Sequence, residues 1–321
     1  MLILLLHVLT LLLLSYVLAL IAWPLLSSGR GGFPFIPDML VVVAIVLAAF
    51  LARQDSAPVR AVLAISGLLV LLRVHSYGSS PNGQGFFDYV RFLSFGLVSP
   101  HLIYSSNRPA LVSRAAPIKQ IGRILFAILL ILLTWSAASR LITSGWGESS
   151  WLLNHLILVA AFTLVMTAFG QCATVSWQIQ GNADKVLVDK IYLSRTPAEF
   201  WRRWSWPMHI WLYRHVYIPV GGKPHHLRAT LAVFTVSGIL HEFIAALVIG
   251  RITGHQMIFF ILSGIGVLAS PSLEKLEERG RAFQAVSRIL TVSFLATTSC
   301  FMFATLDYIV PVYYKHVWLR W

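Results

Sequence analysis

Long runs of apolar residues, separated by short polar loops, dominate the sequence. A helix that crosses a bilayer needs about 20 apolar residues, because each residue adds about 1.5 Å across a hydrocarbon core of about 30 Å. The pattern predicts nine such helices, give or take one, at residues 2–26, 38–52, 60–74, 86–104, 121–139, 151–170, 229–250, 256–270 and 289–310. The expected fold class is therefore all-α, a polytopic integral membrane protein with about nine transmembrane helices.

Residues 171–228 interrupt this pattern and form the longest polar stretch of the chain. Their basic residues alternate with many aromatic residues, a mixture typical of amphipathic helices at the level of the lipid headgroups. Thr196, Pro197 and Glu199 form a helix start, with Thr as N-cap, Pro at the first helical position and Glu at the third. We expect a helix from Pro197 to Trp204, which Pro207 then bends or restarts. A role limited to anchoring the chain at the interface is the alternative.

An ionisable pair, His241-Glu242, interrupts the apolar segment 229–250, with His241 at the thirteenth of its 22 positions. Such residues are costly at that depth, about 2.5–3.5 kcal/mol when charged, and usually face a cavity or a partner. Successive helical residues point about 100° apart, so the two side chains cannot face one narrow site. A neutral imidazole can remove a hydroxyl proton near neutral pH, so His241 is a candidate general base and Glu242 a structural partner. A simple helix–helix contact is the competing interpretation of His241.

The composition excludes a water-soluble domain. Hydrophobic residues make up 57% of the 321 positions and charged residues only 12%, about half of the usual share of roughly 25%. The net charge of +13 therefore indicates membrane orientation rather than nucleic-acid binding. With a cytoplasmic N-terminus, 18 of the 25 basic residues fall in cytoplasmic loops and five on the opposite side, which favours that orientation.

Other chemistry is weakly supported. The two cysteines, Cys172 and Cys300, lie in apolar stretches and define no disulfide framework. No histidine pair has metal-ligand spacing with acidic or cysteine companions, so we expect no metal site. A proton-coupled transporter using His241, Glu242 and Asp307 is an alternative function, although the inverted repeats typical of transporters are not found.

Two motifs in this order resemble the membrane-bound O-acyltransferase family. The first runs from Arg195-Thr-Pro-Ala-Glu-Phe-Trp-Arg-Arg-Trp-Ser-Trp-Pro-Met-His-Ile-Trp211 to Gly222, and the second is Ser237-Gly-Ile-Leu-His-Glu-Phe243. Their form is most similar to the branch with sterol and diacylglycerol acyltransferases and wax synthases. The resemblance implies a single membrane-embedded acyltransferase domain over 1–321, with 171–228 as its interfacial motif segment on the cytoplasmic side and 229–250 as its histidine-bearing helix.

The resemblance also implies the roles of individual residues. His241 matches the family histidine that activates the acceptor hydroxyl. The second family position, commonly Asn or His, falls on Ser205, a departure that leaves three options: a reduced role for Ser205, substitution by a neighbour such as His209, or different chemistry. The basic and aromatic residues expected to bind the donor are Arg202, Arg203, Trp204, Arg214, Lys223 and Arg228.

The implied function is transfer of an acyl group from an acyl thioester such as acyl-CoA to the hydroxyl of a lipid or alcohol, including wax esters. O-acetylation of a sugar or polysaccharide is a second possibility. Acyl-CoA is then a substrate and no cofactor is expected. The other expected partners are membrane lipids and a second copy of the chain, with no nucleic acid. The chain is short for eukaryotic members, so we expect a compact form in a bacterial inner membrane.

Overall fold

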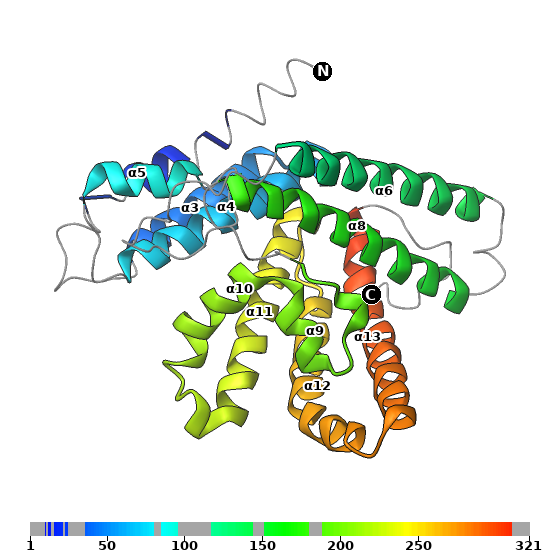
Figure 1. Ribbon diagram of the computed structural model, residues 1–321. Coiled ribbons are helices and arrows are strands. Elements are labelled where there is room, and N and C mark those ends of the chain that lie inside the picture. Colours follow the sequence, from blue (N-terminus) through cyan, green and yellow to red (C-terminus); the bar gives the residue numbers. More distant parts are fainter. Residues whose placement is uncertain are drawn as a thin grey trace. The chain divides into compact units, whose positions relative to one another are not determined.

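The computed structural model in Figure 1 describes residues 36–79, 85–95, 117–143, 151–179 and 188–309, with short parts of 10–24. Within these ranges every regular element is a helix. The chain divides into two units. Unit 1 comprises residues 1–109 with 242–252, and unit 2 comprises 110–241 with 253–321.

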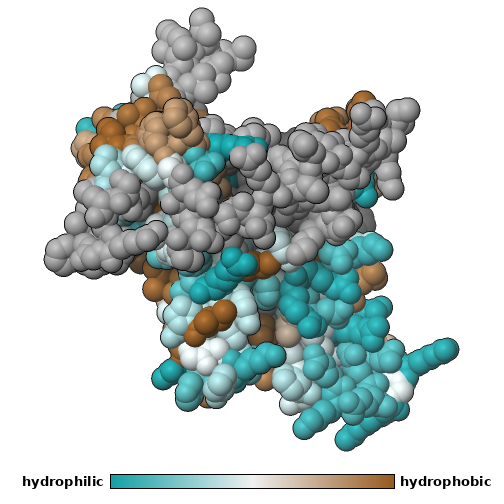
Figure 2. Space-filling view, turned by 60° about the vertical axis from the view of Figure 1, so that its left-hand side comes forward, coloured by the Kyte–Doolittle hydropathy of each residue, from teal (hydrophilic) through white to brown (hydrophobic). Residues whose placement is uncertain are grey.

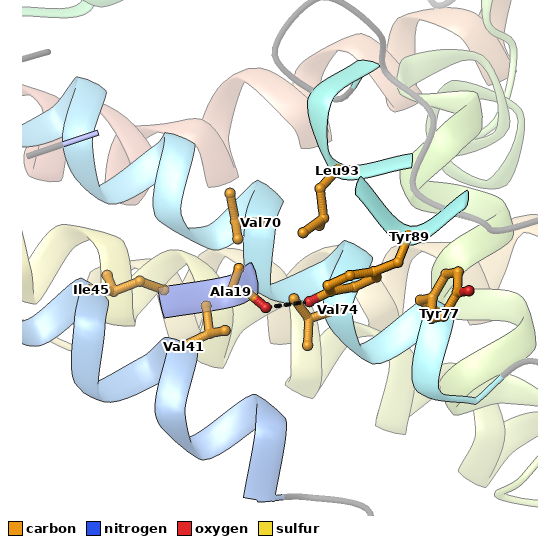
Figure 3. Close-up of a cluster of buried hydrophobic side chains, with 8 residues drawn as sticks. All are labelled: Ala19, Val41, Ile45, Val70, Val74, Tyr77, Tyr89 and Leu93. Carbon is orange, nitrogen blue, oxygen red and sulfur yellow. Dashed lines mark hydrogen bonds between the residues drawn. The ribbon is translucent and has the colours of Figure 1, made fainter. Parts of the chain in front are cut away.

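Unit 1 contains helices α3 (Ile36–Leu51), α4 (Ala57–Gly78) and α5 (Phe86–Phe95). Its apolar core joins α3 to α4 through Val41, Ile45, Val70 and Val74, as Figure 3 shows. The hydroxyl of Tyr89, on α5, reaches into this core and donates to the carbonyl of Ala19 at 2.6 Å. Burial of a phenol is tolerated there because its only strong donor has a partner.

Unit 2 contains the long helices α6 (Pro117–Thr143), α8 (Trp151–Ile179), α11 (His226–Ile249, up to residue 241), α12 (His255–Glu277) and α13 (Arg281–Ile309), and the short helices α9 (Pro197–Trp204) and α10 (Trp206–Leu212). The pairs α6–α8 and α12–α13 lie side by side (Figure 1). Leu158 and Phe303 form the core between α8 and α13. Phe234, Phe259 and Phe260 form a second core, against which Trp201 packs.

The described helices agree with the predicted spans in position but not in length. Five are long and apolar enough to cross a membrane: Ala57–Gly78, Trp151–Val175, Lys223–Ile249, His255–Glu277 and Arg281–Tyr308. Pro37–Leu51 and Ile121–Thr134 are shorter apolar helices. The segments predicted at 60–74 and 256–270 thus belong to helices of 22 and 23 residues. Most of 2–26 and the second half of 86–104 lie outside the described residues.

The motif segment begins later than the sequence suggests, because α8 continues to Ile179. Within the segment, the predicted helix start is confirmed: the Thr196 hydroxyl accepts the amide of Glu199 at 3.2 Å, and Pro197 is the first residue of α9. The helix ends at Trp204, Ser205 adopts an extended conformation, and α10 restarts at Trp206.

A π-helix, Tyr213–Tyr217, follows α10, and a turn through Gly221 leads to α11. Gly221 has φ +123°, and a Cβ there would approach the His225 ring to 2.7 Å. Both the backbone conformation and the close contact exclude a larger residue, so this turn needs glycine.

Four interactions hold Arg195, directly before α9. Its carbonyl accepts the hydroxyls of Ser287 at 2.9 Å and Thr291 at 2.7 Å, both from α13. Its amide donates to Glu199 at 2.7 Å, and its guanidinium lies 3.5 Å from the Glu277 carboxylate on α12. The start of α9 is therefore fixed against both α12 and α13.

We expect Thr291→Val to lower the stability of the protein by about 0.5–1.5 kcal/mol, because it removes one of the two hydroxyls that satisfy a carbonyl outside helical bonding. Thermal unfolding in detergent measures this as a lower melting temperature. Thr297→Val is the matched control, since Thr297 lies on the same helix but is exposed. Equal melting temperatures for the two variants would contradict the anchoring role.

Candidate active site

A cavity of about 450 Å³ lies within unit 2 along one face of α11. Residues 226, 230, 233, 234, 237 and 241 line it, a spacing of three and four that follows a single helical face. The lining changes along the helix from His226 and Thr230, through Val233 and Phe234, to Ser237 and His241. At about 1.5 Å per residue, this face extends about 22 Å.

The opposite wall comes from α12, which contributes Phe260, Val267 and Glu274 at intervals of seven residues. The two helices run in opposite directions (Figure 1), and a Cβ on Gly264 would lie 3.0 Å from that of Phe234. This close approach needs small residues.

The third wall is formed by α9, α10 and the π-helix, including Trp201, Met208 and Tyr213. The cavity is therefore a channel between three walls. His241 and Phe260 lie at one end of it, and His226 and Glu274 lie at the other.

His241 is exposed in this channel, as a reacting base must be. Its Nδ1 lies 2.8 Å from the carbonyl oxygen of Ser237, one turn earlier on α11. A carbonyl can only accept, so Nδ1 carries the hydrogen of the neutral ring and Nε2 keeps its lone pair. The ring of Phe260 packs at 4.4 Å between centroids and fixes the orientation of the imidazole.

Ser205 and His209 line the same cavity from the start of α10. The Ser205 hydroxyl makes no capping bond to α10, and no hydrogen bond to it is found among the described residues, so it can bind a substrate. Desolvation by the cavity walls and, to a lesser degree, the positive charge of Arg202 lower the pKa of His209 below its ordinary value. This lower pKa favours the neutral imidazole of His209.

The six predicted donor-binding residues divide into two groups. Arg202, Trp204 and Lys223 line the cavity, and neither cation has an ion pair within the described residues. Trp204 stacks on Phe162 of α8, with 5.9 Å between the rings. The other three, Arg203, Arg214 and Arg228, do not line it.

Two of these three arginines hold protein groups. Arg203 binds Glu199 at 2.7 Å, and Arg228 donates to the carbonyl of Val220 at 2.6 Å. Burial of Glu199 disfavours its charge, but the Arg195 amide and the Arg203 guanidinium outweigh this effect and lower the pKa of the carboxyl. Loss of Arg203 would leave that carboxylate without its main counter-ion.

Glu242 is buried and is not among the residues that line the cavity, as expected from the 100° between neighbouring helical positions. Cys172 and Cys300 are free thiols. Within the described ranges, no group of three histidine, cysteine or acidic side chains could hold a metal ion.

Sequence reasoning missed several cavity residues. The predicted span 256–270 ends before Glu274, whereas α12 continues through Pro271 to Glu277. The seven-residue spacing of Phe260, Val267 and Glu274 is a usable signal for this longer helix. The sequence argument gives His226 no role, yet its Nδ1 lies 3.0 Å from the Tyr217 hydroxyl at the channel end.

Comparison with known proteins gives one family and several relatives. A family model described as MBOAT, membrane-bound O-acyltransferase family, matches residues 3–304. A probable sterol O-acyltransferase 2 of Schizosaccharomyces pombe is 31% identical over 33% of this chain and 24% of its own length. A diacylglycerol O-acyltransferase 1 of Corylus americana is 43% identical over 15% of this chain and 9% of its own. A probable long-chain-alcohol O-fatty-acyltransferase 3 of Arabidopsis thaliana is 30% identical over 35% of this chain and 36% of its own. The chain thus matches about a third or less of the length of these relatives.

We expect Arg202→Gln to raise the pKa of His209, because it removes a positive charge that disfavours the imidazolium. Desolvation persists, so the pKa stays below its ordinary value. Diethyl pyrocarbonate modifies neutral imidazole, so the pH dependence of His209 modification, followed by mass spectrometry, should shift to higher pH. Lys275→Gln removes an exposed cation that does not line the cavity and should leave the profile unchanged. An unshifted profile for Arg202→Gln would show that its charge does not act on His209.

Proposed function

Because the chain belongs to the membrane-bound O-acyltransferase family, we propose that it is an enzyme that transfers an acyl group from an acyl thioester to the hydroxyl of a lipid or alcohol. The donor we propose is acyl-CoA. The relatives support this acceptor class, since their names refer to sterols, diacylglycerol and long-chain alcohols. All three are apolar molecules with one reacting hydroxyl, which can reach the site from within a bilayer.

The observation that carries the proposal is the state of His241. The Nδ1–H of His241 is bound to the Ser237 carbonyl, and its ring is exposed in a mainly apolar channel. This arrangement supports the role of a base that acts on a substrate. A histidine used only to join helices would bond to a neighbouring helix, whereas the Nδ1 bond of His241 is made within α11.

In the proposed reaction, Nε2 of His241 accepts the acceptor hydroxyl proton while the hydroxyl oxygen attacks the thioester carbon. The C–O bond forms, the C–S bond breaks, and the departing thiolate takes the proton from the imidazolium. The Nδ1–H bond to Ser237 stabilises the transient positive charge. The step needs neither a covalent acyl-enzyme nor a metal.

Arg202 and Lys223 are the best-placed partners for the donor's phosphates, because they line the cavity and form no ion pairs within the described residues. Trp204 supplies an aromatic wall beside them. Arg203 and Arg228 stabilise the motif segment instead.

Ser205 and His209 supply the remaining polar groups of this wall. Ser205 offers a hydroxyl to the acceptor or to the thioester carbonyl. His209, whose neutral form is favoured, is a second hydrogen-bond partner on the same wall.

The charge distribution supports a cytoplasmic channel entrance. The turns that lead into α11 and out of α12 carry hydrophilic residues, which gather on the lower part of the face in Figure 2. Basic residues at Lys223, Lys275, Arg279 and Arg281 belong to this end. By the positive-inside rule, these residues favour an entrance on the cytoplasmic side. This orientation agrees with a multi-pass protein of nine spans and a cytoplasmic N-terminus, which we retain as a proposal.

We expect His241→Ala to lower acyl transfer at least about 100-fold, because general-base catalysis contributes about 10²–10⁴-fold. The assay follows labelled acyl-CoA into ester, using purified protein and a panel of sterol, diacylglycerol and long-chain alcohol. His225→Ala removes an exposed histidine outside the cavity and should retain activity. Full activity of a folded His241→Ala protein would reject His241 as the base.

We expect Ser205→Ala to lower kcat about two- to tenfold, equivalent to one hydrogen bond of about 0.5–1.5 kcal/mol in the transition state. Ser293→Ala changes an exposed serine of α13 and is the matched control. Unchanged kcat for Ser205→Ala, combined with a large loss for His209→Gln, would assign the second polar role to His209 instead.

A further inference from the structure

The proposed reaction puts a positive charge on His241, in a part of the cavity that is poor in negative charge. When Nε2 accepts the acceptor hydroxyl proton, the neutral imidazole becomes an imidazolium, and the charge lasts until the departing thiolate takes the proton. Among the described residues that line the cavity, the only carboxylate is Glu274, about four helical turns along α12 from Phe260. Glu242 is buried and does not line the cavity. A cation in mainly apolar surroundings is unfavourable unless a neighbouring group stabilises it.

Phe260 is well placed to stabilise this charge, because its ring lies against the imidazole of His241. The two ring centroids are 4.4 Å apart, and the ring planes are inclined by 37°. Rings that met edge to edge would hold their centroids further apart, so the imidazole lies over a face of the Phe260 ring. The face of an aromatic ring carries the negative part of its quadrupole, and it attracts a cation that lies within about 6 Å of the ring centroid.

Packing holds the Phe260 ring in this position. The side chain is buried, and its ring makes an edge-to-face contact with Phe259, with 5.1 Å between the centroids. The ring of Trp201 packs at 5.6 Å from it. On α11, Gly238 allows α12 to come close, since a Cβ there would lie 2.9 Å from a side-chain atom of α12. The contact between Phe260 and His241 is therefore fixed by the packing of the two helices.

We propose that the face of the Phe260 ring stabilises the imidazolium of His241 by a cation–π interaction, so that Phe260 promotes acyl transfer by acting through the base. The proposal rests on the proposed function, in which His241 accepts a proton. The neutral imidazole carries no charge for the ring face to attract, so the interaction strengthens as the charge develops. An interaction made only with the charged state lowers the barrier of the transfer step and leaves substrate binding unchanged.

Fluorination of the ring tests the proposal, because each fluorine withdraws electrons from the ring face while the shape of the side chain changes little. Phe260 is replaced, by genetic-code expansion, with phenylalanine that carries one, two or three fluorines on its ring. The rate of acyl transfer from labelled acyl-CoA is measured in a single turnover, with the enzyme in excess. This rate should fall with each added fluorine, by about 3- to 30-fold in total. The KM from steady-state assays should not change.

Phe259 is the matched control position, because it is also buried on α12 and does not line the cavity. The same fluorinated residues there should leave the rate unchanged. A rate that does not fall with the number of fluorines at Phe260, equal losses at both positions, or a change in KM alone would overturn the proposal.

The proposed function is judged separately on the unfluorinated protein. Absence of acyl transfer there, or full activity of His241→Ala, would reject that function and this inference with it. A flat fluorination series at Phe260, in a protein whose activity is lost in His241→Ala, would reject the inference alone.

Discussion

The backbone of Arg195 is the point on which one wall of the channel depends. Its carbonyl is held by two hydroxyls of α13 and its amide by Glu199. Helix α9 has only eight residues and begins at Pro197, and an isolated helix of that length is not stable in water. Two sets of contacts stabilise the first turn of α9 against longer helices. One is the Arg195 carbonyl bound to α13, and the other is the hydrogen bond from the Ala198 amide to the Ser270 hydroxyl at 3.0 Å. The residues of α9 and α10 that line the channel thereby gain defined positions.

The facing wall depends on small residues rather than on hydrogen bonds. Gly238 lies so close to α12 that a Cβ would meet the Met257 sulfur at 2.9 Å, and Gly264 allows Phe234 the same approach. Close backbones bring Phe260 onto the His241 ring. The Nδ1–H bond is made within α11 itself, so the base is oriented by its own helix and only supported by its neighbour. Chemistry and packing therefore use different faces of α11, which is why His241 is exposed in the cavity while the next residue is buried.

Local signals explain what the sequence could predict. Thr196, Pro197 and Glu199 act within one turn, so the start of α9 was readable, and the break before Pro207 was as well. His241 was identifiable because an ionisable residue stands out among apolar neighbours. The sequence does not show which arginine faces the channel. Arg202 and Arg203 point about 100° apart on α9, and the contacts of Arg195 with α13 decide how α9 is rotated about its axis. Similarly, the length of α12 beyond Pro271 depends on its packing against α9 and α13, which hydropathy does not record.

The net charge of +13 acquires a more specific meaning in this arrangement. Most basic residues lie in loops, where they favour one orientation of the chain. Others, such as Arg203, stabilise the motif segment. Of the described lysines and arginines, only Arg202 and Lys223 line the channel. One carboxylate, Glu274, lines the same cavity. The charges that act on a bound ligand are therefore a small part of the total, and they are selected by the helical faces that α9 and α12 turn toward α11 rather than by the number of basic residues.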